Sequence, residues 1–130
     1  GESFGRNRVL RYEPDKVTLE GTLELQTFPG RPNYENIKGG DVSETQWYLR
    51  LDQPIDVETN PLDKSGSWEP EKEVKFVQVI IDDKDWAKRG RGKRIRATGS
   101  LFHQWIGHHH ARVLFTIETM KDLASAGRQP

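Results

Sequence analysis

The feature that most constrains this chain is a set of short segments in which apolar and polar residues alternate with a period of two. In residues 17–25, apart from Gly21, every second residue is apolar: Val17, Leu19, Leu23 and Leu25. This alternation puts successive side chains on opposite faces of a β-strand, one buried and one wet. Comparable segments follow at 45–51, 74–81, 93–102 and 111–119. The sequence therefore predicts five strands.

Two glycines interrupt the apolar alternation. Gly21 lies in the first predicted strand and Gly99 in the fourth. Because a strand glycine commonly marks a bend or a bulge, we expect the sheet to curl at both positions.

A short helix is predicted after the third strand, from Asp82 to Arg89, with an acidic N-cap, Trp86 facing inward, and Gly90 ending the helix. Three strands, a helix and two strands is the element order of the OB-fold, a small partly open barrel. The predicted fold is therefore all-β, a five-stranded OB-like barrel with one short helix between strands 3 and 4. A two-sheet sandwich built from the same strands is the alternative.

The 130 residues fit one domain. We expect an N-terminal extension at 1–15, the OB-like barrel at 16–120 and a flexible tail at 121–130. The segments 28–44 and 58–73 are rich in glycine, proline and polar residues, as long loops are.

Composition excludes several classes of site. There is no cysteine, so disulfides and thiolate chemistry are absent, and no apolar run approaches the length of a membrane span. The sequence carries no nucleophile elbow, P-loop, dinucleotide fingerprint or zinc-protease motif. We therefore expect a non-enzymatic protein.

The charges balance overall but are unevenly placed. Lys plus Arg and Asp plus Glu both number 20. A basic run in residues 84–96 supports an alternative function, a nucleic-acid-binding OB module, with Tyr48 or Phe76 stacking on bases. Nucleic acid is the less expected partner, because these residues fall on the helix and its exit. The candidate residues are Lys88, Arg89, Arg91, Arg94 and Arg96.

All four histidines lie within residues 103–110. A turn at Gly107 could bring His103 opposite His108 or His110, and imidazole is a good ligand for a divalent metal. A histidine-dependent metal site at these three residues is therefore a second alternative. In the simpler interpretation the histidines bond the backbone of a tight loop, and no cofactor is needed.

Residues 92–115, GKRIRATGSLFHQWIGHHHARVLF, carry a T-G-x-L-F-H segment followed by G-H-H-H. This text resembles an uncharacterised bacterial family, a domain of unknown function, and residues 12–37 and 45–55 resemble it too. The resemblance implies an exported protein, periplasmic or secreted, sometimes beside a segment similar to the lysozyme-inhibitor type called LprI. It implies no established activity.

We expect a cell-envelope binding module that recognises a protein or glycan through loops 28–44 and 103–110. The candidate contacts are Arg31, Tyr34, Trp105 and His108. Trp105 is either an anchor for the partner or a plug for the end of the barrel. By resemblance alone, the role would be that of an inhibitor or immunity protein.

Overall fold

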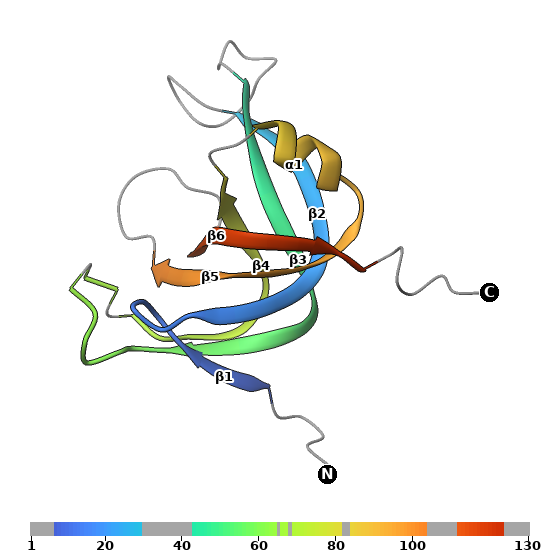
Figure 1. Ribbon diagram of the computed structural model, residues 1–130. Helices are drawn as coiled ribbons and strands as arrows, with labels where there is room; N and C mark the ends of the chain where they lie inside the picture. The colour runs from blue at the N-terminus through green and yellow to red at the C-terminus, as the bar shows by residue number, and fades with distance from the viewer. Residues whose placement is uncertain are drawn as a thin grey trace.

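The computed structural model describes residues 7–29, 43–64, 66–67, 69–81, 84–103 and 112–123. Five long strands form most of it (Figure 1). They are β2 (Val17–Pro29), β3 (Ser43–Glu58), β4 (Glu71–Ile80), β5 (Arg94–His103) and β6 (Val113–Asp122). The helix α1 (Lys84–Gly90) connects β4 to β5, and a short strand β1 (Arg8–Arg11) precedes β2.

The five long strands close into a ring. β2 is antiparallel to β3 and to β5, β3 to β4, and β5 to β6. The parallel pair β4 and β6, with Gln78 opposite Leu114 and Ile80 opposite Thr116, completes the circuit. This single curled sheet, with its helix between the third and fourth ring strands, confirms the all-β, OB-like prediction, and the two-sheet alternative is not found.

The sheet reaches beyond the predicted strands. β1 pairs in parallel with the end of β3, from Arg8 opposite Ile55 to Arg11 opposite Glu58, so part of the expected extension at 1–15 belongs to the sheet. At the other end, β6 continues to Asp122, which lies opposite Ile95. Four residues are too few for alternation to reveal a strand, which is why β1 escaped prediction.

The two strand glycines let neighbouring backbones approach closely where the sheet curls. A Cβ at Gly21 would lie 2.2 Å from the carbonyl oxygen of Arg50, and one at Gly99 would lie 1.9 Å from that of Thr116. Gly21 stands where β2 is paired with both β3 and β5, and the β5–β6 register shifts at Gly99. The irregularity expected at Gly99 is therefore confirmed, and Gly21 marks the place where β2 is shared between β3 and β5.

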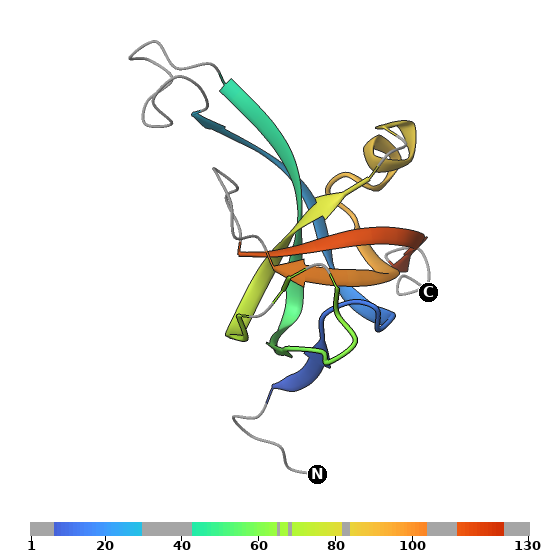
Figure 2. The same ribbon diagram turned by 90° about the vertical axis from the view of Figure 1, so that its left-hand side faces the viewer.

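Inward-facing residues of all five ring strands make one hydrophobic core. Its fully buried members include Leu19, Leu23, Leu49, Val77, Ile95, Leu101 and Phe115. Each such side chain contributes about 1.5–3 kcal/mol to folding. The helix α1, above β5 and β6 in Figure 2, adds buried Ala87 and half-buried Trp86, as expected of its inward anchor. Among the described residues no helix is long and apolar enough to cross a membrane.

Candidate functional site

The outer surface of β3 and β4 carries a group of side chains that the core does not use. Leu49 and Val77 lie opposite each other and point into the ring, so their neighbours along each strand point outward. These neighbours form what we term the β3–β4 face: Gln46, Tyr48, Arg50, Phe76 and Gln78.

An aromatic pair lies at the centre of this face. The rings of Tyr48 and Phe76 are 5.8 Å apart between centroids and inclined at 58°. Tyr48 is only 1% exposed, whereas Phe76 keeps 45% of its surface exposed. Tyr48 is therefore the buried neighbour of Phe76 on this face, and part of the Phe76 ring is open to a ligand.

Polar groups flank the aromatic pair. The Gln78 amide donates to Gln46 Oε1 at 3.2 Å. Arg50 is held by Glu24 of β2, with Nε 2.8 Å and Nη2 2.7 Å from the same carboxylate oxygen. The face thus offers the Gln46 amide and the Arg50 guanidinium as donors, and Glu24 balances the charge of the guanidinium.

Buried outer residues continue from this face around the ring. Tyr48 lies opposite Gln78, Gln78 opposite Leu114, and Leu114 opposite half-buried Phe102. Tyr48, Gln78 and Leu114 are at most 3% exposed although they point away from the core. Burial raises the pKa of Tyr48 from 10.0 to about 12, because the phenolate would lose its hydration.

The topology assigns this face a specific place in an OB-like ring. OB-folds bind oligonucleotides and oligosaccharides on their second and third strands, together with the connections between strands 1 and 2 and between strands 4 and 5. Here those strands are β3 and β4, and those connections hold residues 30–42 and 104–112. The loops singled out from the sequence, 28–44 and 103–110, correspond to these two connections in the element order, and most of their residues lie outside the described part of the chain.

His103 serves the interior of the fold. It is 9% exposed, its Nε2 lies 2.8 Å from Glu71 Oε2, and its ring meets that of Tyr12 edge-on at 6.1 Å. The backbone N–H of His103 donates to Ser67 Oγ at 2.8 Å. These contacts join the end of β5 to the start of β4 and to the connection before it.

The same contacts extend through Tyr12. Its hydroxyl donates to the carbonyl of Glu69 at 2.6 Å, and the Asn60 amide donates to the carbonyl of Tyr12 at 2.9 Å. Burial first, and then the charges of Glu71, Glu69 and Asp63, raise the pKa of Tyr12. This cluster anchors the connection between β3 and β4 to one end of the ring.

The described part of the chain holds no group of three or more His, Asp or Glu side chains placed to share a metal ion. Glu71, the partner of His103, has the cation of Arg112 at 3.8 Å. His108 and His110 lie outside the described residues, as do Arg31, Tyr34 and Trp105.

The candidate nucleic-acid residues separate into two groups. Arg94 and Arg96 are in ion pairs, Arg94 Nε with Asp52 at 2.7 Å and Arg96 Nε with Glu20 at 2.7 Å. Lys88 and Arg89 are exposed on α1, and Arg91 is exposed just after it. The ring places Arg94 and Arg96 beside β2, away from β4 and the Phe76 ring.

Sequence reasoning identified Tyr48 and Phe76 as stacking candidates but missed Gln46, Arg50 and Gln78. The signal was present, because all three occupy outward positions of two predicted strands. What the sequence could not supply was the register that puts Tyr48 opposite Gln78 and Arg50 opposite Phe76.

Comparison with known families gives one match. Residues 76–121, from within β4 to near the end of β6, match the family model described as "Domain of unknown function (DUF4431)". The expected resemblance to an uncharacterised domain family is thereby confirmed for this part of the chain. No curated protein matches the sequence.

Proposed function

We propose that this protein is a non-enzymatic binding module of the cell envelope that recognises a glycan on the β3–β4 face. The observation that carries the proposal is the Phe76 ring, 45% exposed and backed by buried Tyr48. The connections 30–42 and 104–112 would complete the site, with Arg31, Tyr34, Trp105 and His108 as further contacts. The envelope location rests on the family resemblance.

The chemistry around Phe76 suits a sugar. An exposed aromatic ring presents a flat apolar surface, on which the C–H face of a pyranose can pack. The half-buried Gln46 amide and the exposed Arg50 guanidinium supply polar groups for sugar hydroxyls, and buried Gln78 holds the Gln46 amide in place. OB-folds use this same face for oligosaccharides.

A polyanion is less suited to this face. Nucleic-acid affinity depends on cations that neutralise phosphates and release counterions. Arg50, Arg94 and Arg96 each already contact a carboxylate, so their field is largely cancelled. A neutral polyol needs no such field.

The test is a titration of the complete chain, followed by amide chemical shifts, with chitotetraose, cellotetraose and an oligothymidylate of about 12 nucleotides. We expect at least one of the two sugars to cause saturable shifts at Gln46, Tyr48 and Phe76. Replacing Phe76 with Ala should weaken sugar binding about tenfold, by analogy with the stacking of a nucleic-acid base on one aromatic ring, which is worth roughly 1–3 kcal/mol.

Leu62→Ala is the matched control, because Leu62 is another exposed apolar residue, at 69%, and lies in the connection before β4. It should bind as the wild type does. The proposal would be contradicted by salt-sensitive binding of oligothymidylate with no response to either sugar, or by equal losses in the two variants. If neither sugar saturates the protein at millimolar concentration, that result would also count against the proposal and would favour a protein partner.

A further inference from the structure

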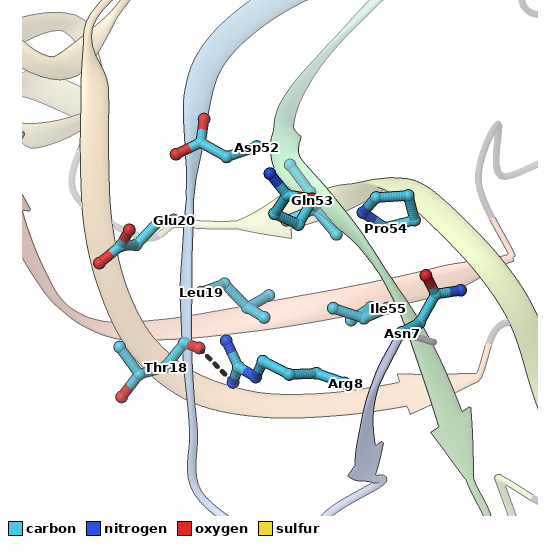
Figure 3. A pocket seen from close by; sticks show the side chains of 10 residues that line it. Asn7, Arg8, Thr18, Leu19, Glu20, Asp52, Gln53, Pro54 and Ile55 are labelled. Atoms are coloured by element: carbon cyan, nitrogen blue, oxygen red, sulfur yellow. Dashed lines mark hydrogen bonds between the residues drawn. The ribbon is translucent and has the colours of Figure 1, made fainter. Parts of the chain in front are cut away.

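A pocket opens on the opposite edge of β3 from β4, where three strands diverge (Figure 3). β2 pairs with β3 only from Gly21 onward, and its earlier residues pair with β5. β1 takes the vacated edge of β3 from Ile55 onward. Between these points the β3–β4 register shifts, so β3 bulges at residues 52–54. The hollow, which we term the side pocket, measures about 380 Å³.

The side pocket has an apolar floor. Leu19 and Ile55 are almost fully buried, at 1% and 2% exposure, and half-buried Leu51 and Pro54 complete the lining on that side. Its volume lies within the range of roughly 300–1,000 Å³ typical of small-molecule sites, and the rest of its lining is polar. A compact branched hydrocarbon group therefore fits the floor.

The carboxylates at the rim are already engaged. Asp52 Oδ2 accepts from Arg94 Nε at 2.7 Å, and Glu20 Oε2 accepts from Arg96 Nε at 2.7 Å. Arg94 Nη2 also lies 3.6 Å from Glu20 Oε1. The two acids and their two arginines balance in charge, so they do not favour a cationic ligand.

Arg8 is the cation in the lining of the pocket. Its side chain lies along the pocket, below Leu19 and Ile55 in the view of Figure 3. Its Nη2 donates to the backbone carbonyl of Thr18 at 2.9 Å. Among the described residues it contacts no carboxylate. A guanidinium has five N–H donors in a planar fork that matches a carboxylate, so most of its donors remain open to a ligand.

The strand that carries Arg8 is fixed in place. The Asn7 amide donates to Asp56 Oδ1 at 2.9 Å and also to Glu73, which binds the start of β1 to β3 and β4. The hydrogen bond from Asn7, and then that from the backbone of Glu73, lowers the pKa of Asp56. Gln53 adds an exposed amide at the rim.

From these observations we infer that the side pocket is a second binding site, separate from the β3–β4 face, for a small monocarboxylate with a branched apolar body. The carboxylate pairs with the Arg8 guanidinium, and the hydrocarbon group packs on Leu19, Leu51 and Pro54. Free branched-chain acids and the carboxyl-terminal residue of a peptide share this chemistry.

The test compares three probes of nearly equal shape on the complete, nitrogen-labelled chain: isovalerate, its neutral amide isovaleramide, and isoamylamine. We expect isovalerate to cause saturable shifts at Arg8, Leu19 and residues 52–55, and to bind more tightly than isovaleramide. Arg8→Gln should weaken isovalerate binding by roughly tenfold or more, since a charge-assisted, bidentate contact is lost. The acid and the amide should then bind equally.

Arg11→Gln is the matched control, because Arg11 is exposed at the other end of the same four-residue strand and does not line the pocket. Its isovalerate affinity should equal that of the wild type. Tighter binding of isoamylamine at the same residues would overturn the inference, because it would show that the ligand's charge is recognised by Glu20 and Asp52 and not by Arg8. Unsaturable shifts with isovalerate, or equal losses in the two arginine variants, would overturn it as well. An amidated and a free-acid dipeptide ending in leucine then distinguish a peptide terminus from a free acid.

Discussion

At the scale of single residues, Gly99 shows how closely the curled sheet brings two backbones together. A Cβ there would lie 1.9 Å from the Thr116 carbonyl oxygen, which is itself backbone and cannot move aside cheaply. We expect Gly99→Ala to lower the free energy of unfolding by about 3 kcal/mol or more, at the upper end of the overpacking range. Urea denaturation measures the change.

Gly92→Ala is the comparison for this variant. Gly92 has a φ of 76° but no atom within 4 Å of a built Cβ, so only backbone strain opposes the alanine, about 1 kcal/mol. Equal free energies of unfolding for the two variants would contradict the prediction, because they would show that the sheet accommodates a methyl group at Gly99 without strain.

The two described tyrosines predict a loss of stability in alkali. Both pKa values are raised in the folded state, that of Tyr48 from 10.0 to about 12. Above pH 10 the unfolded chain releases phenolic protons that the folded chain keeps, so the free energy of unfolding falls as pH rises from about 10 toward 12. Urea midpoints across this window should fall, and the fall should be shallower in Tyr48→Phe. A Tyr34→Phe background leaves Tyr12 and Tyr48 as the tyrosines whose titration is followed by tyrosinate absorbance. If both titrated at their ordinary pKa, the prediction would be wrong.

At the scale of elements, the connection between β3 and β4 depends on His103 and Tyr12 for its position. His103 contacts Glu71 and Ser67, and Tyr12 contacts Glu69 and Asn60. We expect His103→Ala to cost about 2–3 kcal/mol, because it leaves buried groups without partners and opens a cavity. Limited proteolysis should cut first in residues 59–70 while the ring strands stay protected.

Arg112→Ala is the matched control for that experiment. Its side chain is 81% exposed and reaches the same Glu71 at 3.8 Å, so an exposed ion pair is all that is lost. Cleavage at the same rate in both variants would mean that His103 does not hold the connection.

The elements also show what the sequence can and cannot reveal. The five ring strands were predictable because alternation is local, and their order with the helix indicated the ring. The strand β1 was not, because four residues carry too little pattern. The side pocket could not be predicted for a different reason. It exists only where Arg8 of β1, Leu19 of β2 and Asp52 of β3 come together, and local periodicity does not determine how strands pair. His103 was predicted at a loop end, and its burial depends on Tyr12 and Glu71, both distant in sequence.

At the scale of the whole molecule, the ring requires both halves of the chain. The second half, residues 71–123, contains β4, α1, β5 and β6, but β4 and β5 each lose a neighbour without β3 and β2. Ile95 and Leu101 would also lose the core partners Leu19, Leu23 and Leu49. We expect this fragment to be unfolded in isolation, since three strands and a short helix cannot close the ring and leave most of their apolar face exposed. Circular dichroism of the fragment, compared with that of the complete chain, measures this. A cooperative thermal transition in the fragment would contradict the prediction.

Ring closure also bears on how the molecule behaves when crowded. Every ring strand has a neighbour on each edge over part of its length, and within the described residues β1 is the one strand that pairs on a single edge. That strand is four residues long and carries an exposed arginine at each end, around partly exposed Val9. Short, charged borders of this kind discourage copies from adding strand to strand. We therefore expect this border to resist strand addition between copies at high concentration, with Arg8 contributing to that protection as well as to the pocket beside it.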